Sequence, residues 1–146
     1  MNYLDEKIVA FRVTVPDAEA AIREAGELLE KGGFVEKAYV EAMVQSYIEN
    51  GPYFVIAPGV AIPHARPEDG ALKSAVSLVK LKEPINFGNE ANDPVRFVFG
   101  LSASNGEEHL KTIQRIARFL KNKETLDKLQ DIETFDSLER LKEETS

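Results

Sequence analysis

The segment Val95–Leu101 constrains the fold of this chain more than any other. Its residues are almost all apolar, so a strand built from them has little polar face to offer to water. Such a strand belongs at the centre of a sheet. The segment Ala75–Leu81 predicts a second, longer strand before it.

Helices are predicted on both sides of these strands along the chain. Pro16-Asp17 starts a helix with Asp17 as its N-cap, and Gly32-Gly33 ends it. The other predicted elements are strands at 8–15, 53–56 and 60–62, a loop at 84–94, helices at 36–50, after Gly106, at 125–130 and at 137–142, and a frayed tail at 143–146. This order predicts an α/β fold, a mixed β-sheet flanked by helices, as one compact domain over residues 1–146.

Composition excludes several classes of function. The chain has 146 residues, a formal net charge of -7 and no cysteine. The negative charge argues against a nucleic-acid partner, and the missing cysteines exclude disulfides and thiolate chemistry. The polar, acidic N-terminus lacks the features of a signal peptide, and no apolar run reaches the roughly 20 residues of a membrane span. We therefore expect a cytoplasmic protein.

The motif Val60-Ala61-Ile62-Pro63-His64-Ala65-Arg66 carries the most distinctive chemistry. Proline fixes the backbone directly before His64, which holds the ring on a rigid support. A neutral imidazole has a pKa of about 6.5 and can attack phosphorus or carbonyl carbon near neutral pH. We interpret His64 as a nucleophile, against the simpler alternative of a histidine that hydrogen-bonds a loop.

Two further side chains are candidates for the same site. His109 is placed in the first turn of the helix that follows the Val95–Leu101 strand, where backbone N–H groups favour an anion. It could donate a hydrogen bond to a phosphoryl group at the sheet edge that His64 shares, or it could be a surface histidine. Arg66 could steady a phosphoryl group or be solvated.

Other chemistries have less support. Two histidines 45 positions apart, without an HExxH pair or cysteines, predict no metal site. Neither a GxSxG elbow nor a Walker-type loop is present. Glu68 and Asp69 could act as bases, but their surroundings favour a turn. Finally, a basic stripe at helical spacing is interpreted as a solvated face, with a docking surface as the alternative; it comprises Lys111, Arg115 and Arg118.

The His64 motif resembles the phosphorylation-site motif of enzyme IIA proteins of the fructose/mannitol class of the bacterial sugar phosphotransferase system (PTS). The resemblance covers essentially the whole chain and includes the Leu81–Gly88 loop and Glu107-Glu108-His109-Leu110. Residues Gly51–Gly59, followed by Pro63–Gly70, are most similar to the ascorbate-type branch. The fructose and nitrogen-regulatory branches carry an Arg-Glu pair before the motif. Here Glu49 is kept and Ile48 replaces the arginine, so that arginine's phosphoryl-binding role is unfilled.

The resemblance implies a type-2 IIA fold and a phosphotransferase mechanism without metal or organic cofactor. His64 would accept a phosphoryl group from the phosphohistidine of the carrier protein HPr and pass it to a separate enzyme IIB. His109 would help to bind that group, and the membrane unit IIC would be reached indirectly. Ascorbate or a related carbohydrate is the expected cargo of the system.

Three points stay open at this level. The same fold could instead serve as a regulatory module whose phosphorylation state controls a partner, and a degenerate protein that no longer transfers is a weaker alternative. Tyr53 or Phe54 could mark the interface of a homodimer, or they could be buried. The imidazole nitrogen that is phosphorylated depends on the hydrogen bond of the other nitrogen.

Overall fold

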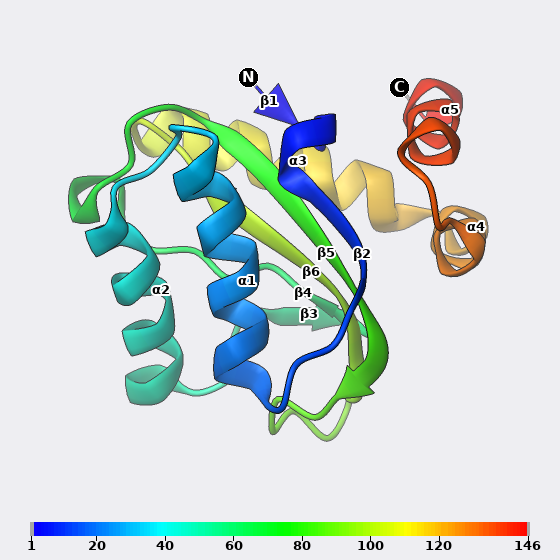
Figure 1. Cartoon of the computed structure of the whole chain (residues 1–146), viewed down its shortest axis with the longest axis horizontal. Helices are drawn as coiled ribbons and strands as arrows, with labels where there is room; N and C mark the ends of the chain where they lie inside the picture. The colour runs from blue at the N-terminus through cyan, green and yellow to red at the C-terminus, as the bar shows by residue number, and fades with distance from the viewer. Residues whose placement is uncertain (1, 146) are drawn as a thin grey trace.

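A mixed sheet runs through the middle of the molecule and is covered by helices on both faces (Figure 1). The computed structural model describes residues 2–145. Its strands are β1 (Asn2–Tyr3), β2 (Val9–Val13), β3 (Val55–Ala57), β4 (Val60–Ala61), β5 (Ala75–Ile85) and β6 (Val95–Ser102). Its helices are α1 (Ala18–Lys31), α2 (Lys37–Asn50), α3 (Gly106–Lys121), α4 (Lys123–Asp131) and α5 (Phe135–Thr145), with short 3-10 turns η1 (Glu6–Ile8) and η2 (Pro67–Asp69). The predicted fold class is confirmed.

The strand order in the described residues is β1-β5-β6-β4-β3. β2 also pairs with β5, farther along that strand than β1. β5 and β6 are antiparallel, whereas β4 runs parallel to β6 and both β1 and β2 run parallel to β5. β6 therefore has a neighbour on each side. This confirms the central position that its apolar sequence predicts.

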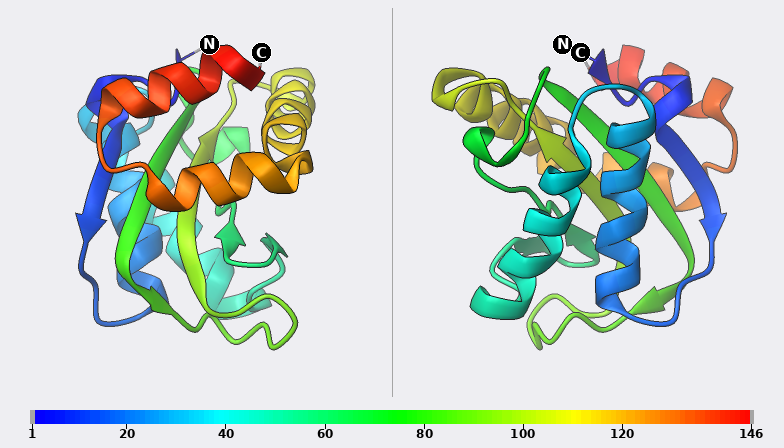
Figure 2. Two further views of the ribbon diagram at one scale, coloured as in Figure 1. Left: turned by 90° about the vertical axis from the view of Figure 1, so that its right-hand side faces the viewer. Right: turned by 60° about the vertical axis from the view of Figure 1, so that its left-hand side comes forward.

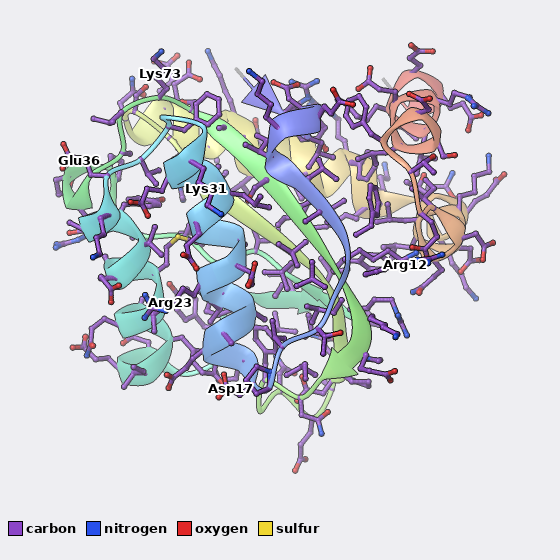
Figure 3. The ribbon with its side chains drawn as sticks, viewed as in Figure 1. Arg12, Asp17, Arg23, Lys31, Glu36 and Lys73 are labelled. Carbon is purple, nitrogen blue, oxygen red and sulfur yellow. The ribbon has the colours of Figure 1, made fainter. Side chains whose placement is uncertain are left out.

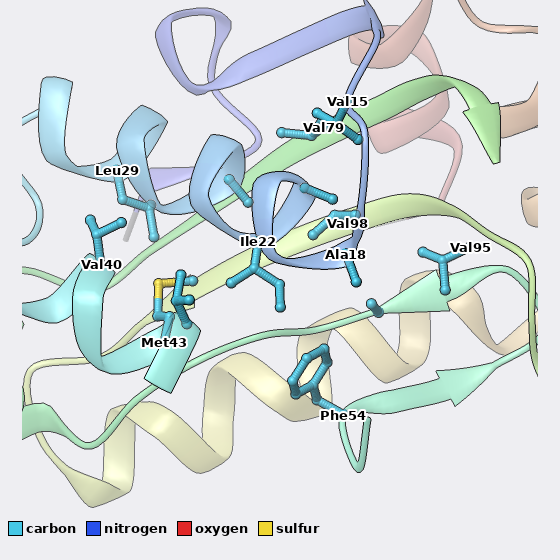
Figure 4. Close-up of a cluster of buried hydrophobic side chains, with 14 of the residues drawn as sticks. Val15, Ala18, Ile22, Leu29, Val40, Met43, Phe54, Val79, Val95 and Val98 are labelled. Carbon is cyan, nitrogen blue, oxygen red and sulfur yellow. The ribbon is translucent and has the colours of Figure 1, made fainter. Parts of the chain in front are cut away.

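Alternate residues of β5 pack into two separate hydrophobic cores, one on each face of the sheet. Ala75, Val79 and Leu81 pack with α1 and α2, in the cluster that Figure 4 shows between those helices and the sheet. Val76 and Leu78 point to the other face and pack with α3, α4 and α5. Figure 2 shows these three helices crossing that second face. The two-residue period of the strand thus sets both layers of helices.

α1 lies unusually close to the sheet, at Gly100 of β6. A Cβ at this position would come within 3.0 Å of the backbone oxygen of Ala25 and would overlap the Ser77 hydroxyl. That hydroxyl donates a hydrogen bond of 2.9 Å to the same Ala25 oxygen. Glycine is needed here because helix and strand leave no room for a side chain.

Side-chain caps define where the helices begin. The Asp17 carboxylate accepts a hydrogen bond of 2.9 Å from the Ala20 N–H, which confirms the predicted N-cap of α1 (Figure 3). The Asn105 side chain accepts from the Glu108 N–H at the same distance and starts α3. Because Asn105 follows β6 closely, this cap fixes where the first turn of α3 leaves the sheet.

The buried lysine Lys80 joins α4 to the sheet. Its side chain is 3% exposed and its Nζ donates to the backbone oxygens of Gln130 at 2.6 Å and Ile132 at 2.7 Å. Nζ also lies 3.2 Å from a Glu133 carboxylate oxygen. The ammonium group therefore satisfies carbonyls at the end of α4, which have no partner within the helix.

Several predicted boundaries were wrong. The strand predicted at 8–15 is shorter, because η1 takes Ile8 and β2 ends at Val13, and β1 was missed. The strand predicted at 53–56 is β3 at 55–57, since residues 52–54 form a turn closed by the Val55 N–H on the Pro52 oxygen. β5 extends to Ile85, into the predicted loop at 84–94.

The C-terminal helices are longer than predicted, and residues 143–145 of the predicted frayed tail belong to α5. Buried Leu138 and Leu141 anchor this helix to the second core. Ser146 lies outside the described residues. Across the part of the chain that the structure describes, every helix is too short or too polar to cross a membrane.

Candidate functional site

His64 lies where the chain leaves β4 beside the end of β6. The Leu101 N–H of β6 donates to the Pro63 oxygen at 3.1 Å, and His64 forms an isolated parallel bridge with Leu101. The rigid Pro63 and this bridge hold the backbone on either side of the ring. The backbone at His64 is therefore supported by the end of β6, a central strand of the sheet.

One hydrogen bond determines the tautomer of His64. Its Nδ1 lies 2.8 Å from the backbone oxygen of Ile62. A carbonyl oxygen can only accept, so Nδ1 carries the proton and donates it. In the neutral ring, Nε2 then holds the free lone pair. The available nucleophilic nitrogen is Nε2.

His109 meets His64 although 45 positions separate them in the sequence. β6 ends next to His64, and the Asn105 cap starts α3 directly afterwards, so the first turn of the helix carries His109 back over the motif. The two ring centroids are 4.9 Å apart and the ring planes meet at 61°. The structure thus brings together both histidines that the sequence singled out.

Burial favours the neutral forms of both rings. Desolvation lowers the pKa of His64 below its usual 6.5, and the neighbouring His109 lowers it slightly more, against the opposing effect of the Ile62 carbonyl. Desolvation also lowers the pKa of His109. At neutral pH, His64 consequently keeps the lone pair that a nucleophile needs.

Tyr39 of α2 connects the His64 motif to β6 through its hydroxyl group. Its hydroxyl donates to the Leu101 oxygen at 2.6 Å and accepts from the Ala65 N–H at 3.1 Å. The side chain is 1% exposed, and burial raises the pKa of its hydroxyl to about 12, so it stays protonated. One hydroxyl therefore ties the residue after His64 to the strand that leads to His109. In the sequence, Tyr39 is one of several mainly apolar residues at helical spacing in the helix predicted at 36–50, and nothing there marks its hydroxyl.

The two histidines open into a cleft of about 630 Å³, called here the histidine cleft. α2 supplies much of its wall, and the lining residues include Gln45, Ser46, Glu49, Asn50, Tyr53 and Gly106. Gly106 begins α3, so the positive end of this helix dipole faces the space beside His64. The polar residues of α2 were not predicted, because only the fold turns that end of the helix toward the motif.

Tyr53 and Phe54 have different environments. Tyr53 is 52% exposed, its ring meets His64 edge-on at 6.2 Å between centroids, and its hydroxyl lies 3.0 Å from Ser46 Oγ. Phe54 is buried in the core with Phe87 and Tyr47. Of the two residues considered for an interface, only Tyr53 is available at the surface.

Arg66 lines the histidine cleft, but its guanidinium group has acidic partners. It pairs with Asp69 at 3.2 Å and with Glu68 at 3.5 Å, and these contacts close η2. Glu68 and Asp69 thus form the expected turn. Ile48 is 54% exposed, and no arginine lines the cleft from α2. Among residues 2–145, no three His, Cys, Asp or Glu side chains gather in an arrangement that could hold a metal ion.

Solved structures resemble this chain over nearly its whole length. The solution structure of the mannitol-specific cryptic phosphotransferase enzyme IIA CmtB from Escherichia coli has a TM-score of 0.85 at 34% identity, covering 95% of this chain and 94% of that one. The IIA of the Escherichia coli complex of mannitol enzyme IIA with phosphorylated mannitol enzyme IIB has a TM-score of 0.83 at 30% identity, covering 95% and 96%.

Sequence relatives agree with the structural likeness. SgcA of Escherichia coli K12, named as a phosphotransferase IIA component, is 37% identical over 92% of this chain and 94% of its own length. The ascorbate-specific PTS system EIIA component of the same strain is 34% identical over 89% and 85%. The family model described as phosphoenolpyruvate-dependent sugar phosphotransferase system, EIIA 2, matches residues 2–144. The chain therefore belongs to this family of sugar-phosphotransferase IIA components.

Proposed function

We propose that this protein is a cytoplasmic phosphocarrier that accepts a phosphoryl group on Nε2 of His64. The observation that carries the proposal is the hydrogen bond from Nδ1 to the Ile62 oxygen at 2.8 Å, which leaves Nε2 as the free nitrogen beside His109. The depressed pKa of His64 supports the same role, since it keeps the ring neutral at physiological pH.

The transfer step needs positioning more than covalent chemistry from the protein. The lone pair of His64 Nε2 attacks phosphorus, the new N–P bond forms, and the N–P bond to the donor histidine breaks. The released electron pair returns to the donor imidazole. His64 gains positive charge during this step, and the Ile62 oxygen stabilises it by accepting from Nδ1. In the second step a nucleophile of the acceptor forms a bond to phosphorus, the N–P bond of His64 breaks, and its electron pair returns to Nε2.

His109 and the start of α3 would bind the phosphoryl oxygens. His109 lies at contact distance from His64 and can donate from its ring, and Gly106 leaves the beginning of the helix open to an anion. Arg66 is proposed as a further phosphoryl stabiliser. Its ion pairs are solvent-exposed and therefore weak, so its guanidinium could exchange Asp69 for a phosphoryl group at small cost.

Family membership and the mannitol IIA–IIB complex support an enzyme IIB partner for this chain. We propose phospho-HPr as donor and a separate enzyme IIB as acceptor, with IIC reached only through IIB. The proposed cargo is ascorbate or a related carbohydrate, supported by the residues around the motif. Mannitol-type and ascorbate-type relatives are almost equally similar, at 36% and 34% identity. The choice of cargo therefore rests on the motif and not on overall identity.

The first test is phosphorylation in a defined mixture. The protein is incubated with phosphoenolpyruvate, enzyme I and HPr, and its intact mass is followed beside that of His64→Ala. We expect the wild type to gain one acid-labile phosphoryl group and the variant to gain none. Phosphorylation of His64→Ala, or an unmodified wild type beside charged HPr, would refute the proposal.

A second stage separates transport from regulation. The phosphorylated protein is mixed with purified ascorbate-type IIB or mannitol-type IIB, and loss of phosphate from His64 is measured. Fast transfer to one IIB supports the carrier role and identifies the type of cargo. If neither IIB accepts the group while His64 remains phosphorylated, the regulatory module becomes the better description.

A further inference from the structure

A second, smaller cleft lies on the far side of α3 from the histidines. It measures about 240 Å³ and is lined by Tyr3, Arg115, Arg118, Phe119, Lys142 and Thr145; we name it the Tyr3 cleft. It lies between β1, the second half of α3 and α5, and none of its lining residues takes part in the proposed phosphoryl-transfer steps. Sites for drug-sized ligands usually measure about 300–1,000 Å³, so this cleft suits a smaller molecule.

The hydroxyl of Tyr3 is buried without a partner. Tyr3 is 5% exposed, and its hydroxyl oxygen is the one buried side-chain polar atom of the described residues that lacks a hydrogen bond. Buried hydroxyl groups in folded proteins are normally paired, because an unpaired one loses its hydrogen bonds to water. Burial raises the pKa of this phenol, so it remains a donor at any physiological pH. A donor without an acceptor indicates a site that an acceptor could fill.

Positive charge surrounds this donor. The Arg115 guanidinium lies 4.0 Å from the centre of the Tyr3 ring, and Lys142 Nζ lies 6.0 Å from it. Arg118 lines the same cleft, and the positive charges of Arg115 and Arg118 oppose the rise in the Tyr3 pKa that burial causes. Such a concentration of cations is unusual in a chain with a net charge of -7.

Carboxylates neutralise this cluster only in part. Within residues 2–145, the ion pairs of α3 and α5 are Lys111–Glu107, Lys128–Glu144 and Lys142–Glu139, and neither arginine takes part in one. The basic stripe that the sequence shows therefore divides into two parts. All three of its residues are exposed, as the interpretation of a solvated face expects, but Arg115 and Arg118 also line the Tyr3 cleft.

We propose that the Tyr3 cleft binds a compact oxyanion, free phosphate or a phosphate monoester, between the Tyr3 hydroxyl and the guanidinium groups of Arg115 and Arg118. The hydroxyl donates to one oxygen, and the arginines donate to the others as charge-assisted hydrogen bonds. Arg115 is exposed and can turn from the ring toward the anion. The site does not include His64, so the oxyanion would also bind to the unphosphorylated protein.

The test is a titration of the isotope-labelled full chain, observed by NMR, in a His64→Ala background that removes the proposed phosphoryl-accepting nitrogen. Inorganic phosphate and glycerol phosphate are the two probes. We expect saturable shifts of amides in β1 and the second half of α3, and the tighter probe identifies whether the free ion or the monoester is preferred. Non-saturable shifts, or shifts confined to the histidine cleft, would overturn the proposal.

Two variants and a matched control sharpen the result. Tyr3→Phe and Arg118→Gln should each weaken binding by about tenfold or more, as expected for loss of a hydrogen bond to a charged group. Lys111→Gln removes the same charge from the same helix and should bind as before. Because the Tyr3 hydroxyl has no partner, Tyr3→Phe should not lower stability without phosphate. Unchanged phosphate affinity in Tyr3→Phe and Arg118→Gln would refute the site.

Discussion

Replacing Tyr39 by phenylalanine should both destabilise the protein and slow phosphoryl transfer, although Tyr39 touches neither partner nor phosphate. The substitution removes one oxygen atom and keeps the ring in the core. That oxygen accepts from the Ala65 N–H and donates to the Leu101 oxygen. Both groups belong to the segments that carry the two histidines.

The magnitude follows from the two groups left behind. A buried polar group without its partner costs about 1–3 kcal/mol, and the Tyr39 hydroxyl serves two of them. Tyr39 is 1% exposed, whereas Ala65 is half-buried. Water can therefore replace part of the hydrogen bonding that the Ala65 N–H loses. We therefore expect a decrease of about 2–4 kcal/mol in the free energy of unfolding.

The effect on rate comes from geometry. Without the hydroxyl, Ala65 is no longer tied to β6, and His64 loses part of its fixed position relative to His109. A displacement of about 1 Å can cost up to about a hundredfold in rate, so a decrease of about tenfold to a hundredfold is expected. The assay is rapid-quench transfer from phospho-HPr, at a temperature where the variant is folded.

Tyr47→Phe is the matched control. Its hydroxyl donates to the Phe87 oxygen at 2.7 Å, in a loop away from the histidines. This variant should lose about 1 kcal/mol of stability and transfer phosphate at the wild-type rate. A Tyr39→Phe protein as stable as the wild type, or equal slowing of transfer in both variants, would refute the positioning role of Tyr39.

Three further outcomes are expected. An NMR titration of the His64 ring should give a pKa below 6.5, because burial disfavours the charged ring. The neutral, reactive form then dominates above this lowered pKa, and transfer declines only as the pH falls through it. A pKa above 6.5 would contradict the effect of burial. Gly100→Ala should lower the free energy of unfolding by about 1–3 kcal/mol, because its new Cβ meets the Ala25 oxygen, and an unchanged urea midpoint would exclude that contact. Lys80→Met should lower the free energy of unfolding in urea by about 1.5–3 kcal/mol, because two carbonyls at the end of α4 lose a charged donor. The control Lys82→Met changes an exposed lysine and should have little effect. Equal decreases in the two variants would disprove the role of Lys80 in anchoring α4.

The sequence predicts the central part of the fold well. The apolar run Val95–Leu101 predicts a central strand, and Asp17 after Pro16 predicts a helix start, because burial and capping each have a local signature. The short strand β1 leaves no such signature. Two residues show no periodicity, and β1 forms only because β5 offers a free edge beside Tyr3.

At the site, the sequence identifies which side chains carry chemistry but not how they are supported. Nothing in the helical stripe of α2 distinguishes Tyr39 from its apolar neighbours, since its hydroxyl acquires a role only when the motif and β6 lie over it. The polar lining from Gln45 to Asn50 was missed for the same reason. These contacts join segments that are far apart in the chain, and sequence spacing carries no information about them.

The residues alone determine that a histidine directly follows proline after a short apolar run, and that a second histidine lies in the first turn of a helix after the central strand. Tertiary structure decides the rest. It sets the 4.9 Å between the rings, the proton on Nδ1 of His64 and the lowered pKa of both histidines. Each of these depends on which backbone oxygen, ring or solvent lies beside the imidazole, and only the packed sheet and helices fix those neighbours.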